Sequence, residues 1–169
     1  YYTTQRLCKT RLWSSLLGLL HFVSWQAIVL AGLIALPMGY TQGRPYAEFE
    51  WAVDVALAIS WIVFFATNFF MIIAKRRERH LYISIWFYVA TVVVMGVLLA
   101  VNAIALPTEQ WRSIPLLAGA HDAMMQWWYG HNVLTFLLTV PFIGFLYYFI
   151  PKLTEQPVFS YKLAILHFW

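Results

Sequence analysis

The sequence has 169 residues, of which 62% are hydrophobic and 11% are charged. A water-soluble domain carries about 25% charged residues, so this composition excludes a soluble globular domain and predicts an integral membrane protein. The single cysteine, Cys8, excludes an internal disulfide framework and a C-x-x-C haem or zinc motif. The net charge of +4 does not indicate a nucleic-acid partner, because the basic residues lie between apolar runs, where they orient membrane helices.

Long apolar runs predict membrane-spanning helices, since about 20 helical residues cross a hydrocarbon core. We expect four complete spans and the start of a fifth, at about residues 12–36, 51–74, 83–106, 123–150 and 161–169. The expected fold class is therefore all-α, a polytopic transmembrane helix bundle. The sequence has no initiator methionine and ends inside an apolar run, so we expect it to be an internal fragment of a longer polypeptide.

The basic residues predict which side of the membrane each loop faces. Alternation of the spans places nine of the eleven Lys and Arg residues on one side: Arg6, Lys9, Arg11, Lys75, Arg76, Arg77, Arg79, Lys152 and Lys162. Short loops rich in Lys and Arg are typically cytoplasmic, so we expect this side to face the cytoplasm. The opposite side has Arg44 and Arg112 and five of the seven acidic residues: Glu48, Glu50, Asp54, Glu109 and Asp122.

The stretch DAMMQWWYGHN, residues 122–132, opens the fourth expected span. At 1.5 Å per helical residue, His131 would lie about 10–13 Å below the outer end of this span. A polar group at such depth is costly and by default marks a functional site. The alternative is a histidine that forms a hydrogen bond with a neighbouring helix, and position alone leaves both interpretations open.

Several motifs together resemble one protein family. WWYGHN at 127–132 is followed by PFIGFLYYFIPK at 141–152 and by EQPVFSYKLAILHFW at 155–169, and it is preceded by WQAIVLAGLIALPMGYTQGRPYAEFEWAVD at 25–54. In this order they resemble the catalytic subunit, subunit I, of the cbb3-type cytochrome c oxidases, the C-type haem–copper oxygen reductases. The resemblance covers the whole chain. It implies that residues 1–169 are part of the transmembrane domain of such a subunit, about five of its twelve helices.

The resemblance implies part of a terminal respiratory oxidase in the bacterial inner membrane. Such an enzyme reduces dioxygen to water with electrons from cytochrome c and couples this reaction to proton translocation. The implied partners are membrane lipid, dioxygen, and the membrane-anchored monohaem and dihaem cytochrome c subunits. The alternatives are a nitric oxide reductase-like subunit, whose metal beside the haem is iron, and a non-catalytic membrane scaffold subunit.

The resemblance also implies site residues. The family's WWYGHN histidine is one of three copper ligands next to a high-spin haem, so His131 is assigned to copper, a metal that imidazole suits. The axial ligands of both b haems, low-spin and high-spin, would lie outside this chain, which therefore holds no complete catalytic site. Glu48 and Glu50 fall in a segment resembling one near a bound calcium ion, which favours oxygen ligands. The family's first glutamate of that segment is replaced here by Pro45 or Tyr46, and an exposed acidic loop is the open alternative.

Of the other four histidines, His21 matches no ligand of the family, and His167 matches the family's HFW motif but not a metal ligand. A role for His121 facing a haem propionate is an open alternative to exposure. We expect His21 to be packed or hydrogen-bonded inside the first span, and His80 and His121 to be exposed to solvent. His167 would be a structural residue within the fifth span.

Overall fold

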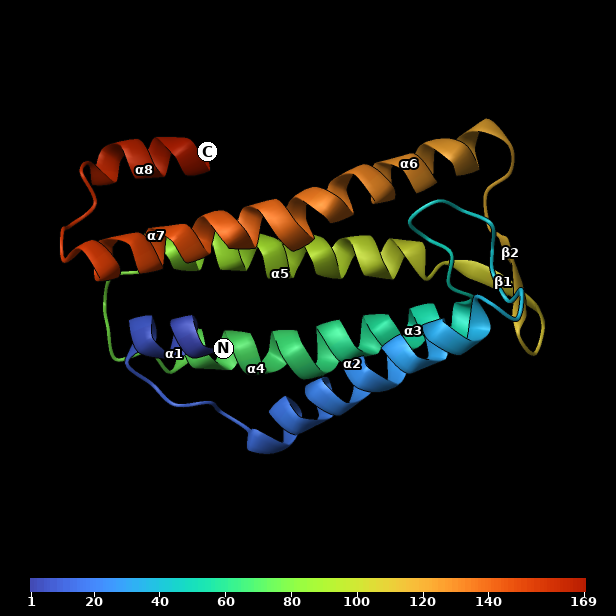
Figure 1. Cartoon of the computed structure of the whole chain (residues 1–169), viewed down its shortest axis with the longest axis horizontal. Coiled ribbons are helices and arrows are strands. Elements are labelled where there is room, and N and C mark those ends of the chain that lie inside the picture. Colours follow the sequence, from blue (N-terminus) through green and yellow to red (C-terminus); the bar gives the residue numbers. More distant parts are fainter.

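The chain is described over all 169 residues by a computed structural model, which shows an elongated bundle of helices lying side by side (Figure 1). Four helical stretches are long and apolar enough to cross a membrane: Ser15–Ala35, Trp51–Ala74, Ile83–Asn102 and Ala120–Thr154. The predicted polytopic helix bundle is thus confirmed. The third stretch ends at Asn102, earlier than expected, because the chain then enters a short β-hairpin.

The elements follow one another in a simple order. The first span is α2 (Ser15–Ala35), preceded by the short α1 (Tyr2–Cys8), and the second span joins α3 (Trp51–Ile59), the π-helical η1 (Ser60–Ala66) and α4 (Thr67–Ala74). The third span is α5 (Ile83–Asn102), and the antiparallel hairpin β1 (Ala105–Glu109) and β2 (Arg112–Pro115) follows it. The fourth span joins α6 (Ala120–Leu134), the π-helical η2 (Thr135–Thr139) and α7 (Val140–Thr154), and α8 (Tyr161–Phe168) comes last.

A buried asparagine fixes the start of α2 against α4. Asn68 is completely buried, and its side-chain Nδ2 donates to the Ser14 carbonyl at 2.9 Å while its Oδ1 accepts from the Ser14 N–H at 3.1 Å. The Ser14 hydroxyl in turn accepts from the Leu17 N–H and caps the helix. Polar groups within an apolar span need internal partners, and here the amide and the helix end satisfy each other.

The most buried span is α5, and it packs closely along α7 (Figure 1). Gly144 on α7 makes this approach possible, because a Cβ atom there would lie 3.1 Å from the Ser84 carbonyl oxygen and 2.9 Å from the Tyr88 ring. Small residues commonly allow such close contact between membrane helices. On the other side of α5, the Trp61 indole N–H donates to the Val92 carbonyl at 3.1 Å and joins η1 to this helix.

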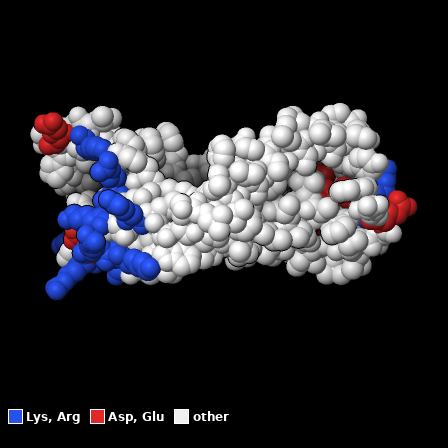
Figure 2. Space-filling view, turned by 90° about the horizontal axis from the view of Figure 1, so that it is seen from below, with Lys and Arg blue, Asp and Glu red and all other residues white.

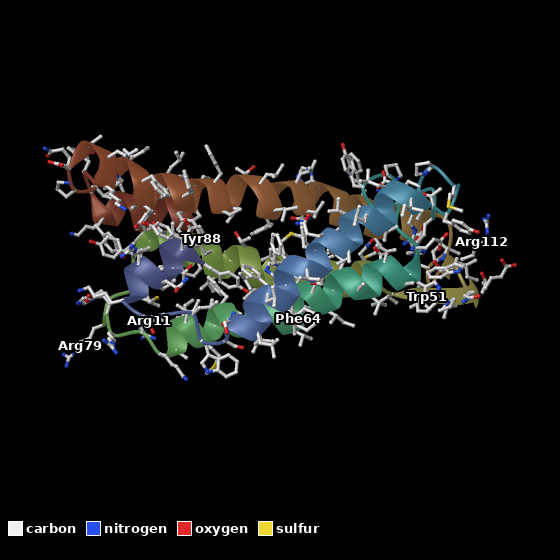
Figure 3. The ribbon with its side chains drawn as sticks, turned by 60° about the horizontal axis from the view of Figure 1, so that its bottom comes forward. Arg11, Trp51, Phe64, Arg79, Tyr88 and Arg112 are labelled. Carbon is white, nitrogen blue, oxygen red and sulfur yellow. The ribbon has the colours of Figure 1, made fainter.

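The charged residues separate to the two ends of the bundle. In Figure 2, Lys and Arg side chains gather at one end, and most of the Asp and Glu side chains lie at the other. Figure 3 places Arg11 and Arg79 at the first of these ends and Arg112 at the second. We call these the basic end, formed by residues 1–13, 75–82 and 151–162, and the acidic end, formed by residues 36–50 and 103–122. Both ends of every candidate span therefore meet a charged or polar layer.

Candidate metal centre

The orientation of α6 is set by a tyrosine in the turn before His131. Tyr129 is buried in the largest apolar cluster of the chain, together with Trp61 and Met95. The neighbouring Gly130 is buried too, and a Cβ atom there would lie 3.2 Å from the Tyr46 ring and 3.5 Å from the Tyr46 Cβ. Tyr46 has a φ of +63°, a backbone conformation that non-glycine residues rarely adopt. The loop before α3 therefore presses directly on the α6 turn that carries His131.

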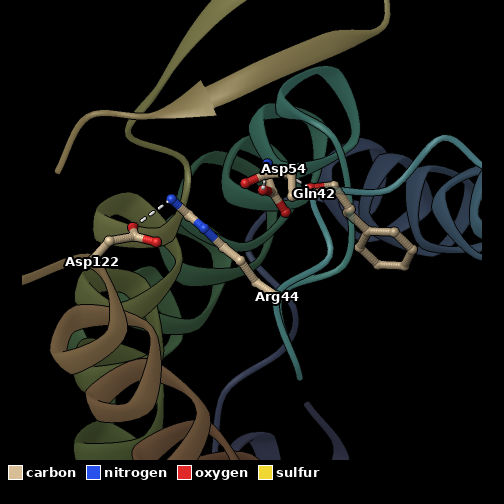
Figure 4. Close-up of polar contacts among 5 residues, drawn as sticks. Gln42, Arg44, Asp54 and Asp122 are labelled. Atoms are coloured by element: carbon tan, nitrogen blue, oxygen red, sulfur yellow. Dashed lines mark hydrogen bonds and ion pairs between the residues drawn. The ribbon is translucent and has the colours of Figure 1, made fainter. Parts of the chain in front are cut away.

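The same loop holds α6 at two further points, each one turn nearer its start. The Arg44 guanidinium donates to the Asp122 carboxylate at 2.7 Å, and this pair is drawn in Figure 4. The Gln126 side chain donates to the Pro45 carbonyl. Asp122, Gln126 and Gly130 are four residues apart, so they lie on one face of the helix. We call residues 44–46 the α6 clasp, because they contact this face over its first three turns.

A buried carboxylate, that of Asp54, lies close to the α6 clasp. Asp54 on α3 is only 3% exposed, and its Oδ2 accepts a hydrogen bond from the Gln42 side chain at 3.3 Å (Figure 4). Gln42 also donates to the Phe49 carbonyl at 2.7 Å, which closes the loop on itself. Glu50 is likewise buried and accepts from the Ser113 hydroxyl at 2.8 Å, which joins the loop to the hairpin.

His131 lies on the other face of α6. Because Tyr129 points into the bundle, His131 points outward. Most residues at helical spacing around it are exposed large apolar residues: Met124, Trp127, Trp128, Leu134 and Leu138. Trp127, one turn earlier, is 61% exposed. His131 itself is exposed, and within this chain its imidazole has no hydrogen-bond partner or ion pair, although its carbonyl accepts from Thr135 at 3.3 Å. It is the only ionisable group on this apolar face.

This arrangement fits a single metal ligand that would be completed from outside the chain. No group of three or more His, Cys, Asp or Glu side chains in this chain could hold a metal ion. An imidazole with both ring nitrogens free can give one nitrogen to a metal and the other to an orienting partner. At or next to the acidic end, Arg44 Nε and Trp51 Nε1 are buried donors without acceptors within the chain. A carboxylate-bearing cofactor would satisfy both donors.

The two glutamates assigned to calcium have separate partners. Glu48 is exposed, and its carboxylate accepts from the Tyr46 N–H at 3.1 Å. Glu50 is buried and accepts from the hairpin through Ser113. Each carboxylate therefore has one known partner and spare lone pairs, and the two are not joined to a third acidic or histidine ligand.

The remaining histidines lie away from His131. His21 is half-buried in the first span and stacks on Phe65 with ring centroids 4.9 Å apart. His80 and His121 are exposed, and His167 Nδ1 is 2.9 Å from the Tyr147 hydroxyl. The sequence did not predict the Arg44–Asp122 pair, although a signal for it existed. Arg44 is one of only two basic residues on the acid-rich side, where an acidic partner is to be expected.

An apolar bundle with four candidate membrane spans and a lone histidine on the outer face of one of them defines an integral membrane protein with one candidate metal ligand. The model of the cytochrome c and quinol oxidase polypeptide I family matches residues 1–169. The chain belongs to this family.

Comparison with individual relatives indicates the same family. The chain is 44% identical over its full length to the cbb3-type cytochrome c oxidase subunit CcoN1 of Stutzerimonas stutzeri and covers 35% of that protein. It is 42% identical to cytochrome c oxidase subunit 1 of Rhodobacter capsulatus, again over the full chain and covering 32% of that protein. The chain thus spans about a third of the length of these relatives. The resemblance to cbb3-type subunit I is confirmed. The prediction of a multi-pass membrane protein of the haem–copper oxidase family is confirmed as well.

Proposed function

We propose that this chain forms part of the catalytic subunit of a terminal oxidase, in which His131 binds copper. The subunit would reduce dioxygen to water with electrons from cytochrome c and translocate protons across the bacterial inner membrane. One observation carries this proposal: His131 is the only exposed ionisable residue between Met124 and Leu138, and its imidazole has no partner within the chain. When bound, copper would supply an open coordination position for dioxygen.

The role of the chain's own residues is to hold that imidazole in place. A histidine binds a metal through a neutral ring nitrogen, so His131 must be unprotonated when the site is filled. Tyr129 fixes the rotation of α6 by burial, and Gly130 lets Tyr46 support the same turn from behind. Trp127 and Leu134 flank His131 on the outer face and would keep water from the ligand.

The other cofactors and partners of the family follow from the same proposal. The low-spin and high-spin b haems would take their axial ligands from parts of the subunit outside this chain, and the cytochrome c subunits would deliver electrons to them. Calcium at Glu48 and Glu50 also stays a prediction. It is supported by the spare lone pairs on both carboxylates and tested by measuring calcium in the purified oxidase after Glu48→Gln.

The test is His131→Ala in the full-length subunit, assembled with its partner subunits. Oxygen uptake should fall to background, whereas the low-spin haem, whose ligands lie elsewhere, should keep its reduced spectrum. His21→Ala is the matched control, because His21 packs on Phe65 in another span, and it should leave oxygen uptake largely intact. Wild-type oxygen uptake by the His131→Ala enzyme would refute the ligand role. Iron in place of copper in the wild-type enzyme would favour the nitric oxide reductase alternative.

A further inference from the structure

A large basic pocket opens at the basic end of the bundle, far from His131. Its volume is about 870 Å³. Five cationic side chains line it, from α1, from the link to α2 and from the segment after α4: Arg6, Lys9, Arg11, Lys75 and Arg77. Figure 2 shows the corresponding concentration of Lys and Arg side chains at this end. Two segments that lie far apart in the sequence thus bring like charges to one cavity.

The walls of the pocket are fixed to one another by hydrogen bonds. The Arg77 N–H donates to the Cys8 carbonyl at 3.0 Å and ties the segment after α4 to the end of α1. The Gln5 side chain accepts from the Leu12 N–H at 2.8 Å and closes the link before α2 over the same cavity. Because the backbone is held at these points, the convergence of the cations is built into the fold.

Most of this positive charge has no counter-charge in the chain. Lys9 pairs with Glu78 at 2.7 Å, and this hydrogen bond keeps the pKa of Glu78 below its ordinary value. None of the other four cations lies within ion-pair distance of a carboxylate. Two of them lie over aromatic rings instead: Arg6 is 5.4 Å from the Tyr2 ring centroid and Lys75 is 5.7 Å from that of Trp13. Four neighbouring like charges repel one another, and a bound anion would relieve that repulsion.

The position of the pocket favours a lipid over a soluble anion. Lys75 directly follows the last residue of α4, and Trp13 lies two residues before α2 begins, so the pocket is level with the ends of two candidate spans. Tryptophan at such a level is typical of the membrane–water interface. Leu12 and Trp13 add an apolar wall beside the cations. Basic pockets at the ends of membrane helices are suited to phospholipid headgroups.

We propose that this pocket binds the phosphate headgroup of an anionic phospholipid. Arg11, Lys75 and Arg77 would contact the phosphate oxygens, and Trp13 would pack beside the glycerol and the upper acyl chains. This assignment does not depend on the metal centre.

The experiment compares two double variants of the full-length subunit in its assembled oxidase. Arg11→Gln with Lys75→Gln removes two charges from the pocket, and Arg79→Gln with Lys162→Gln removes two charges from the same end outside it. Native mass spectrometry of the delipidated complex, titrated with cardiolipin, would count bound lipids and give their affinities. At about 1 kcal/mol for each cation near the headgroup, the pocket variant should bind one cardiolipin about 30-fold more weakly, and the control variant should not.

Further titrations determine whether the bound phosphate belongs to a lipid or to a soluble anion. They also distinguish a loss of binding from misfolding of the variant. Phosphatidylcholine should not fill the site, and pyrophosphate should not fill it in the absence of lipid. Glu78→Gln, which frees Lys9, should tighten cardiolipin binding several-fold, a gain that a misfolded variant cannot produce. Equal cardiolipin binding by the two double variants would overturn the proposal, as would equal binding of phosphatidylcholine. Pyrophosphate binding without any lipid preference would also overturn it, since the site would then bind a soluble anion.

Discussion

Arg44 and Asp122 lie 78 positions apart in the sequence, yet their side chains meet at 2.7 Å with only 13% and 23% of each exposed. The pair joins the loop before α3 to the first turn of α6, the helix that carries His131. Asp122 also lies in the first helical turn, where a negative charge is favourable. This contact is therefore the clearest structural link between the acidic end and the candidate metal centre.

A double-mutant cycle should detect this link. Arg44→Ala and Asp122→Ala should each lower the thermal stability of the assembled subunit, because each leaves a largely buried charge without its partner. The double variant should lose less than the sum, with a coupling free energy of about 1–2 kcal/mol. Differential scanning calorimetry of the four proteins gives this coupling. Additive losses would mean that the pair does not hold α6.

The contact of Gly130 with Tyr46 predicts a second coupling. Alanine is the better helix former by about 1 kcal/mol, but its Cβ would press on the Tyr46 ring at 3.2 Å, and overpacking costs about 1–3 kcal/mol. Gly130→Ala should therefore destabilise the wild-type subunit and should be neutral or stabilising when Tyr46→Ala is also present. Thermal unfolding would measure both.

Gly96 in α5 is the matched control for that prediction. The nearest atom to a Cβ at Gly96 lies 3.8 Å away, an ordinary contact distance, so Gly96→Ala should be tolerated. If Gly130→Ala and Gly96→Ala behave alike in the wild-type background, the α6 clasp does not press on the turn before His131.

The charge separation between the two ends predicts the topology of the chain. In intact cells, with reactive cysteines removed, Arg79→Cys at the basic end should resist a membrane-impermeant thiol reagent added from outside. Thr108→Cys in β1 at the acidic end should react readily, since this residue is exposed. The basic residues would then face the cytoplasm as the positive-inside rule requires. Labelling of position 79 from outside would reverse this orientation.

Much of the architecture could be predicted from the sequence, because each apolar run and its flanking charges determine a membrane span and its two ends without contacts to other segments. The spans begin and end close to the expected residues, and His21 is packed as expected. The features of the site that were not predicted depend on contacts between distant segments. The Arg44–Asp122 pair and the support of Gly130 by Tyr46 both need the tertiary fold. The hairpin at 105–115 is local, but its two short strands interrupt a loop without a clear alternating pattern. Local patterning indicates that Arg44, on the acid-rich side, needs an acidic partner, but it does not say which of the acidic residues that partner is.

Copper binding by His131 can be measured as the copper content of the assembled oxidase. Copper measured by inductively coupled plasma mass spectrometry and divided by the low-spin haem content should fall to background in His131→Ala. The ratio should stay at the wild-type value in His21→Ala, since that side chain only packs within the bundle. A His131→Ala enzyme that keeps the wild-type ratio of copper to low-spin haem would show that His131 is not a copper ligand.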